Sequence, residues 1–147
     1  MKRLFFVAVA LAVTLVSCGT DKGVATTIRG RFVGSGVDTV YLERVSDNLT
    51  TPEAIGRVAL ADNGGFEFEF GIEEGTSPRF YRLAFEGGRR PVTLVVAPGD
   101  NIELESAGDI FRNYEVEGSE ESALIKEFNR DYFTAVGRVA RIAEGID

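Results

Sequence analysis

Side chains that most often perform catalysis or bind metals are scarce in this sequence. The 147 residues include no histidine, no tryptophan, one cysteine and one methionine. Histidine is the usual general base and a common zinc ligand, and cysteine supplies thiolate nucleophiles, so chemistry that depends on either side chain is largely excluded. We therefore predict a protein that is not an enzyme and that uses no cofactor or metal.

Basic residues are also in the minority. The chain has 16 Lys and Arg against 23 Asp and Glu, for a net charge of −7. A surface this acidic repels the phosphate backbone, so we expect no nucleic-acid partner. The apolar fraction of 44% is normal for a globular protein, and the length suits one domain with a single core.

The longest uncharged run lies at the N-terminus. Lys2 and Arg3 precede it, and it extends from Leu4 to Val16. About 20 apolar residues are needed to cross a bilayer, so this run is too short to span one. A basic start followed by a short apolar stretch is typical of a secretory signal peptide.

The only cysteine follows this run. Leu15, Val16 and Ser17 precede Cys18 and resemble the lipobox of bacterial lipoproteins, in which the cysteine is acylated and becomes the first mature residue. We predict a signal peptide over residues 1–17, recognised through Leu15, Val16 and Ser17, with lipidation of Cys18. Residues 18–25 would then be the lipidated cysteine and a tether. The alternative is a free cysteine after an ordinary signal peptide, which would be a reactive thiol in an oxidising compartment.

A lipid anchor would also determine the location of the protein. Because two or more acyl chains hold a protein stably on a membrane, the chain is expected in the cell envelope. The anchor could face the periplasm from the inner or the outer membrane, or lie at the cell surface.

Residues 26–118 have the pattern of strands joined by turns. Short apolar runs alternate with clusters of Gly, Asn, Asp or Pro, as in all-β domains. In residues 66–70 the alternation of Phe and Glu is strict, so one face should be core and the other solvent. The expected strands are residues 27–33, 39–45, 55–61, 66–70, 79–86, 91–97, 101–106 and 113–117. This spacing predicts an antiparallel β-sandwich of seven or eight strands.

Turn residues suggest which strands pair. The first two strands should form a hairpin after Gly34-Ser35-Gly36. Asn63-Gly64 should join the third and fourth in a hairpin, since both residues tolerate a positive φ. Pro98-Gly99 fits a type II turn, which would make the strand after it the partner of the strand before it.

The inner faces follow from the same alternation. Tyr81, Leu83 and Phe85 should form one buried row, and Ile102 and Leu104 another. Residues 91–97 are apolar on both faces and are expected to form a central strand covered on both sides.

After Gly118 the period changes to that of a helix. Residues 120–146 contain no proline, Ser119 is the expected N-cap, and Glu120 and Glu121 occupy the first turn, where the helix dipole favours negative charge. An apolar stripe recurs every three or four positions at Leu124, Phe128, Tyr132, Ala135, Val139 and Ile142. Ile125, Phe133 and Val136 widen this face beyond what packing on one sheet requires. We therefore predict that residues 119–147 form an amphipathic helix that also contacts a protein partner.

Two pairs of carboxylates lie two positions apart on expected strands. On a strand, the β-carbons of Glu67 and Glu69 should lie about 6.6 Å apart, and so should those of Glu103 and Glu105. This separation is within the range found between the two catalytic carboxyl groups of an inverting glycosidase. Such an enzyme needs its carboxylates on opposite sides of a cleft, which neighbours on one strand face cannot provide. We interpret both pairs as solvated faces.

Other candidate sites are weaker. Ser122 and Lys126 share a helix face, but acidic neighbours would keep the lysine charged and unable to act as a base. Arg89-Arg90 could hold an anion or simply form a solvated loop tip.

Two short motifs are also too weak to define a site. Asp62-Asn63-Gly64 lacks the further acidic ligands of a calcium loop. Asn48-Leu49-Thr50 matches the glycosylation acceptor pattern, but the pattern is only three residues long.

Once these elements are placed, the sequence resembles a known family. It is similar to the N-terminal β-rich domain of unknown function found in bacterial lipoproteins of the thiol-disulfide interchange type. The residues that carry this resemblance are Ile28-Arg29-Gly30, Val40-Tyr41-Leu42-Glu43, Gly65-Phe66-Glu67-Phe68, Phe80-Tyr81-Arg82-Leu83, the Pro98-Gly99-Asp100 turn with its flanking residues 95–102, Tyr114 to Ser119, and the lipobox.

In that family a thioredoxin-like domain with a Cys-x-x-Cys motif follows this domain. A chain with one cysteine lacks that motif, so the redox site cannot be carried over to any residue. The resemblance implies an accessory module that positions a redox domain or partner, and we expect the chain to be either a fragment of such a protein or a stand-alone version.

Two functional hypotheses follow. The first is a non-catalytic, lipid-anchored envelope module whose helix contacts a thioredoxin-like domain or another protein. The alternative is a stand-alone lipoprotein that binds a small ligand or glycan through loops such as Ser46–Pro52 and Glu73–Pro78. A hydrolase would need an activated nucleophile and a base, and the sequence offers no convincing pair.

Overall fold

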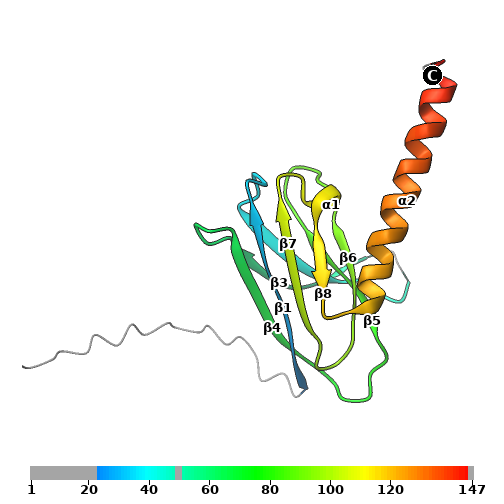
Figure 1. The fold of residues 1–147 in the computed structure, drawn as a ribbon. Helices are drawn as coiled ribbons and strands as arrows, with labels where there is room; N and C mark the ends of the chain where they lie inside the picture. Colours follow the sequence, from blue (N-terminus) through cyan, green and yellow to red (C-terminus); the bar gives the residue numbers. More distant parts are fainter. Residues whose placement is uncertain (1–22, 49–50, 146–147) are drawn as a thin grey trace, which may run out of the picture.

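The computed structural model describes residues 23–48 and 51–145 (Figure 1). The predicted signal peptide, Leu15, Val16, Ser17 and Cys18 lie outside the described residues. The elements are β1 (Val24–Val33), β2 (Thr39–Arg44), β3 (Glu53–Ala59), β4 (Gly65–Ile72), β5 (Arg79–Ala84), β6 (Val92–Val96), β7 (Asn101–Ala107), α1 (Ile110–Asn113), β8 (Glu115–Glu117) and α2 (Glu120–Ala143). Since β1 begins at Val24, residues 24 and 25 belong to a strand and not to the predicted tether.

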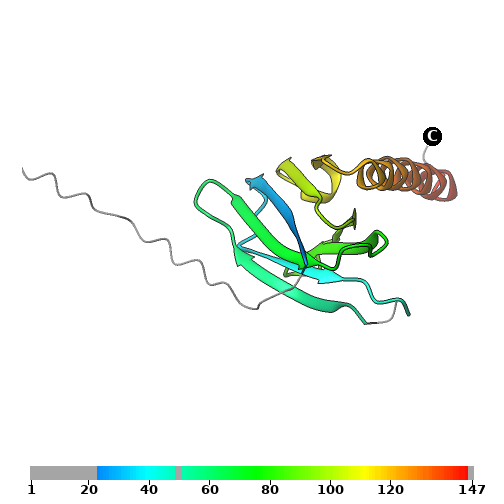
Figure 2. The ribbon, with the colours of Figure 1, turned by 90° about the horizontal axis from the view of Figure 1, so that it is seen from below.

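The strands form two four-stranded sheets, with the orders β4-β1-β7-β8 and β3-β2-β5-β6 (Figure 2). Both sheets contribute to one hydrophobic core. Its members are Ile28, Phe32, Val40, Leu42, Phe66, Phe68, Ile72, Tyr81, Leu83, Phe85, Val92, Leu94, Val96, Ile102, Leu104, Ile110 and Tyr114. The predicted buried rows are confirmed, and the mostly-β class with a C-terminal helix is confirmed as well.

The prediction that all strands run antiparallel is wrong for the first sheet. β1 pairs antiparallel with β4 but parallel with β7, where Ile28 lies beside Ile102 and Gly30 beside Leu104. The second sheet is antiparallel throughout. β1 and β7 are separated by five other strands in the sequence, so no tight turn fixes their relative direction.

Two of the predicted hairpins are also wrong as strand pairs. β1 and β2 lie in different sheets, and so do β3 and β4. The Asn63-Gly64 turn itself does form: the Gly64 N–H donates to the Ala61 carbonyl at 2.8 Å, and Gly64 has φ +81°. A Cβ on Gly64 would lie 2.4 Å from the Phe32 carbonyl oxygen, so only glycine fits. The turn therefore reverses the chain at a corner between the sheets.

The strand expected at the centre of a sheet is an edge strand. β6 pairs only with β5, and the strand after the Pro98-Gly99 turn, β7, pairs with β1 and β8 instead. The free edge of β6 is covered by α2, which packs against β6 and β8. In Figure 2, α2 lies beside the sheets on the side where these two edge strands meet.

The first turn of α2 satisfies the free backbone of β6. The Val95 N–H donates to Ser122 Oγ at 2.9 Å, while the Val95 carbonyl accepts from Ser119 Oγ at 2.9 Å and from Ser122 Oγ at 3.2 Å. Ser119 Oγ also accepts from the Ser122 N–H, which confirms the predicted N-cap. An edge that would otherwise be open to pairing is thus closed by two serines.

A short helix was missed by the sequence analysis. Residues expected at the start of the last strand form α1 instead: Asn113 ends it and Tyr114 is its C-cap. Asp109 caps the other end, since Asp109 Oδ1 accepts from the Arg112 N–H at 3.1 Å. A single turn of helix has no apolar period long enough to read from a sequence.

Candidate functional site

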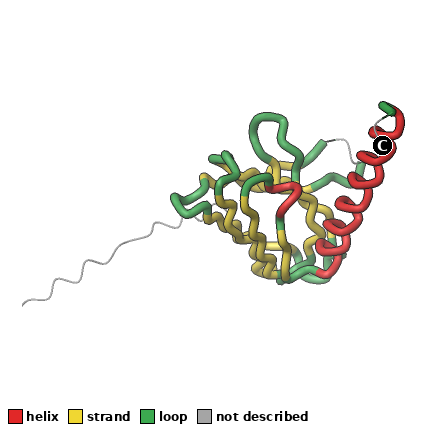
Figure 3. Tube along the Cα trace, turned by 45° about the horizontal axis from the view of Figure 1, so that its top comes forward, coloured by secondary structure: helices red, strands yellow, loops and turns green. Residues whose placement is uncertain are grey.

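Only the first half of α2 contacts the sheets, and the rest extends beyond them (Figures 1 and 3). The side that faces the sheets carries Ser122, which is fully buried, together with the partly buried Lys126 and Phe133. At about 100° per residue these three positions fall within roughly 40° of one another. They define the contact face of α2.

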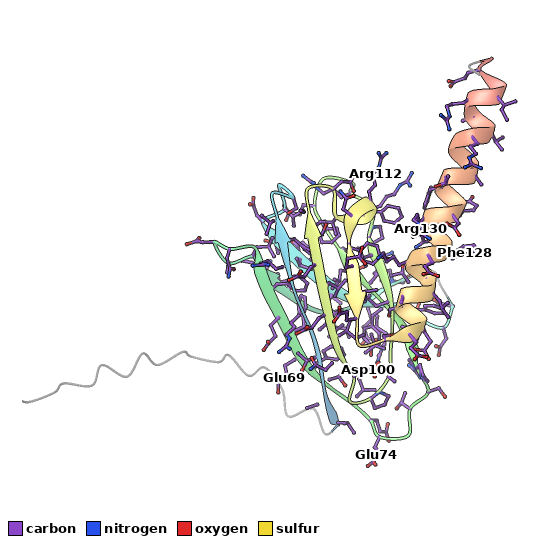
Figure 4. The ribbon with its side chains drawn as sticks, in the orientation of Figure 1. Glu69, Glu74, Asp100, Arg112, Phe128 and Arg130 are labelled. Atoms are coloured by element: carbon purple, nitrogen blue, oxygen red, sulfur yellow. The ribbon has the colours of Figure 1, made fainter. Side chains whose placement is uncertain are left out.

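The predicted apolar stripe does not lie on that face. Leu124, Phe128, Tyr132, Val139 and Ile142 lie about 200° to 280° around the helix from Ser122. Their side chains are accordingly exposed, with fractions of Leu124 64%, Phe128 68%, Tyr132 52%, Val139 66% and Ile142 71%. Val136, which is 45% exposed, lies only about 40° from Ser122 and does not belong with these five. The expectation that the stripe packs on the sheet is therefore wrong. We call these five residues the outer face of α2; Figure 4 labels Phe128 among them.

Charge is unevenly distributed along α2. Glu120 and Glu121 lie in the first turn, whereas Arg138 and Arg141 are the only charged residues between positions 132 and 143. Together with Arg130 they lie about 80° to 160° around the helix from Ser122. The distal half of α2 thus presents an apolar face bordered on one side by arginines, on a chain whose net charge is negative.

An aromatic contact marks the last point at which α2 touches the body. The Phe133 ring meets the Phe111 ring edge-on at 5.3 Å. The Arg90 guanidinium lies 4.1 Å from the centre of the Phe133 ring and 5.4 Å from that of Phe111. This cation–π contact joins α1, the β5–β6 loop and α2.

A second contact lies nearer the start of α2. Lys126 Nζ is paired with Glu115 Oε2 and lies 6.0 Å from the centre of the Tyr114 ring. Tyr114 is buried, and among the described residues its hydroxyl has no hydrogen-bond partner. Burial, helped by the nearby Glu115 carboxylate, raises the pKa of Tyr114 to about 12.

Ser122 and Lys126 do share a helix face, as the sequence predicted. The Ser122 hydroxyl, however, both donates to and accepts from the Val95 backbone, and Lys126 is held by Glu115. Both side chains are engaged in holding α2 on the sheets. The arrangement gives neither of them a free partner for proton transfer.

The two carboxylate pairs lie on the outer surface of the first sheet. Arg29 is paired with Glu103, and Arg31 lies 3.4 Å from Glu105. These residues, with Glu67, Glu115 and Glu117, line a shallow depression of about 730 Å³. Glu69 lies on the same surface of β4 and is exposed (Figure 4). Two cross-strand ion pairs thus engage Glu103 and Glu105 on a surface that is otherwise rich in carboxylates.

Of the two loops proposed for ligand binding, the Glu73–Pro78 loop lines a cavity. Glu73, Thr76 and Ser77 help to line a cavity of about 160 Å³ beside Arg44 and Tyr81. In the Ser46–Pro52 loop, Ser46 Oγ is 2.5 Å from Asn48 Oδ1, and residues 49 and 50 lie outside the described part. The glycosylation motif Asn48-Leu49-Thr50 therefore lies partly outside the described residues.

Arg89 and Arg90 do not form a free loop tip. They line a cavity of about 520 Å³, together with residues 108–112 and the loop after β1. Sequence reasoning missed Arg112 and Phe111, because α1 brings them beside residues some twenty positions earlier. Residues 109–112 show no hydrophobic periodicity, so the sequence did not indicate that they would lie beside Arg89 and Arg90.

Membrane and metal sites were searched for within the same described ranges. Neither helix there is long and apolar enough to cross a membrane. No three His, Cys, Asp or Glu side chains in residues 23–48 and 51–145 are grouped so that they could hold a metal ion.

Comparisons with known proteins identify no family. No family model and no curated protein matches the chain. Among solved structures, the chain is similar to the dioxygenase domain of a dioxygenase carbohydrate-binding protein fusion from the cellulolytic bacterium Streptomyces sp. SirexAA-E, at 18% identity. The match covers 67% of this chain and 79% of that one with a TM-score of 0.33, which is too low to carry an argument. The resemblance to thiol-disulfide interchange lipoproteins stays a prediction.

Proposed function

We propose that this protein is a non-catalytic, lipid-anchored module of the cell envelope, in which a β-sandwich presents α2 to a protein partner. The observation that carries the proposal is the outer face of α2, where five large apolar side chains are between 52% and 71% exposed. Apolar surface concentrated in this way is a common property of protein interaction sites. Single exposed apolar residues need no explanation, but five along one face of one helix do.

The way in which α2 is attached supports the same proposal. Ser119, Ser122, Lys126 and Phe133 hold the helix through contacts on the opposite side. The outer face is therefore not needed to keep α2 in place and is free to bind. A partner that covers it would contact i, i+3 and i+4 anchors, as in other helix recognition.

The chemistry of this face indicates what kind of partner fits. Its centre is aromatic and aliphatic, and Arg138 and Arg141 border its distal half. A complementary surface would be apolar with acidic residues at its rim. We infer a thioredoxin-like domain as the partner, because the sequence resembles the accessory domain of lipoproteins that carry one.

Anchoring is proposed from Cys18 and the residues before it. Acylation would hold the module at a membrane and confine its partner to the same surface. Metabolic labelling with a fatty acid should mark the native protein and fail to mark Cys18→Ala, which should also appear in the soluble fraction. Equal labelling of both proteins would contradict the anchor.

Partner docking is tested by crosslinking in cells. A photo-reactive amino acid at Phe128 should give an adduct whose second component, identified by mass spectrometry, contains a thioredoxin-like domain. The same group at Arg57, which is exposed on β3, is the control and should give no such adduct. No adduct at Phe128, or the same adducts at both positions, would contradict a partner on α2; an adduct with another protein would refute the thioredoxin-like partner alone.

A further inference from the structure

A second surface of the molecule has the features of a binding site. It is the cavity of about 520 Å³ at the end of the sheets where three connections meet: the loop after β1, the loop after β5 and α1. Figure 4 labels Arg112 at this end. The volume is within the range of small-molecule pockets, which is roughly 300 to 1,000 Å³.

Positive charge predominates among the residues that line it. Arg89, Arg90 and Arg112 contribute three guanidinium groups, and Asp109 is the only carboxylate. That carboxylate already accepts from the Arg112 N–H and lies 3.8 Å from the Arg112 Nε. The local excess of positive charge contrasts with the net charge of −7 for the whole chain, and such a cavity attracts anions.

Two of the three arginines are held in place before any ligand arrives. Arg89 donates to the Ser35 carbonyl at 2.8 Å and to the Gly36 carbonyl at 3.2 Å, which leaves other N–H groups of its guanidinium unused. Arg90 is positioned by the Phe111 and Phe133 rings. Within the described residues Arg90 makes no hydrogen bond or ion pair, so its in-plane donors are available to a ligand.

The floor of the cavity is apolar. Phe85 and Ile110 are buried there, and Phe111 is partly buried beside them. Guanidinium groups bind carboxylate and phosphate groups through paired N–H donors, while aromatic rings bind flat apolar groups. The cavity therefore combines donors for an oxyanion with a surface for the body that carries it.

We propose that this cavity binds a small organic anion, with an oxyanion held by Arg89, Arg90 and Arg112 and an aromatic or apolar group placed against Phe85 and Phe111. Both a carboxylate and a phosphate ester supply such an oxyanion, because guanidinium groups recognise either one. This site is independent of the docking proposed for the outer face of α2, which lies on the other side of that helix.

The test is a titration of the full chain, followed by calorimetry and by NMR, with four probes at low ionic strength. Phenyl phosphate, benzoate and inorganic phosphate are the anionic probes, and benzyl alcohol is the neutral aromatic control. We expect saturable binding of phenyl phosphate or benzoate, with shifts in the amides of residues 89–90 and 108–112, and no saturable binding of benzyl alcohol. The tighter of the two aromatic anions identifies the preferred oxyanion.

Variants separate the site from general surface charge. Arg112→Gln should weaken the preferred anion about tenfold or more, and the exposed position of this side chain makes a loss of folding unexpected. Arg57→Gln removes an exposed arginine from β3 and should leave binding unchanged. Arg90→Gln should weaken binding too, but it also changes the contact with Phe133 and so needs circular dichroism as a check on α2.

Several results would overturn the proposal. One is the absence of saturable binding for all three anions. Others are shifts spread evenly over the surface, equal loss in Arg112→Gln and Arg57→Gln, or binding of benzyl alcohol as tight as that of the anions. None of these results would affect the crosslinking test of α2, so the two proposals fail separately.

Discussion

The first turn of α2 and its distal half belong to one helix but lie in different surroundings. Ser119 and Ser122 are buried against β6 and bond its backbone. Val139 and Ile142, six and nine residues beyond Phe133, touch neither sheet and are more than 60% exposed. Polar side chains are thus buried and apolar ones exposed, which is the reverse of the usual arrangement. The base of α2 therefore serves the fold, and we propose that its outer face serves binding.

The largest expected effect comes from a matched pair of leucines. Leu104 is fully buried in the core and Leu124 is on the outer face of α2. Leu104→Ala should lower the free energy of unfolding by about 2–5 kcal/mol through lost burial and a cavity, whereas Leu124→Ala should change it by less than about 0.5 kcal/mol. Denaturant unfolding of both variants measures the difference. Similar losses would mean that the outer face is part of the fold.

A smaller effect is expected where α2 meets β6. Ser122→Ala removes the side chain that accepts from the Val95 N–H and leaves that donor without its partner. We expect a loss of about 1–3 kcal/mol, accompanied by faster hydrogen exchange in the first turns of α2. Ser77→Ala, at an exposed loop position, is the control and should have almost no effect. If both variants were equally stable, the serine contact would not be what holds the helix.

The smallest effect at neutral pH concerns a pair of tyrosines. Because the pKa of Tyr114 is raised to about 12 in the folded protein, the unfolded chain loses this proton first as the pH rises through 10. Stability should therefore fall by about 1.4 kcal/mol per pH unit between pH 10 and 12 from this group alone. Tyr114→Phe should remove that part of the pH dependence.

The exposed Tyr132 on α2 is the matched control for Tyr114. Tyr132→Phe removes an exposed hydroxyl and should change the free energy of unfolding at pH 7 by less than about 0.5 kcal/mol. At neutral pH Tyr114→Phe should be neutral or stabilising by up to about 1 kcal/mol, because the hydroxyl has no partner among the described residues. A loss of more than 1 kcal/mol at pH 7 would show that this hydroxyl is bonded after all.

Much of the local structure could be predicted from the sequence. The alternation of Phe66, Glu67 and Phe68 correctly assigns the two faces of β4, and Ser119 is the N-cap expected from the change of period at Gly118. These features depend on residues close together in the chain. A period of two residues reports which side of a strand is buried, and here it does so for β4, β5 and β7.

Strand partners and the orientation of α2 could not be predicted in the same way. Nothing near Ile28 indicates that Ile102 lies beside it in a parallel pair. Likewise, an apolar stripe shows that α2 has a face to cover, but not that Ser122 and Lys126 would take the place against the sheets. Both outcomes depend on contacts between distant segments, which local periodicity does not record.

The central claim, that a partner covers the outer face of α2, is tested most directly by the accessibility of one introduced thiol. The chain has a single cysteine, Cys18, which acylation would block, so Val139→Cys should provide the only reactive thiol. A maleimide reagent should label it rapidly in the purified protein and slowly in intact envelopes. Arg57→Cys, on β3, should be labelled equally in both. Rapid labelling of Val139→Cys in the envelope would contradict the account.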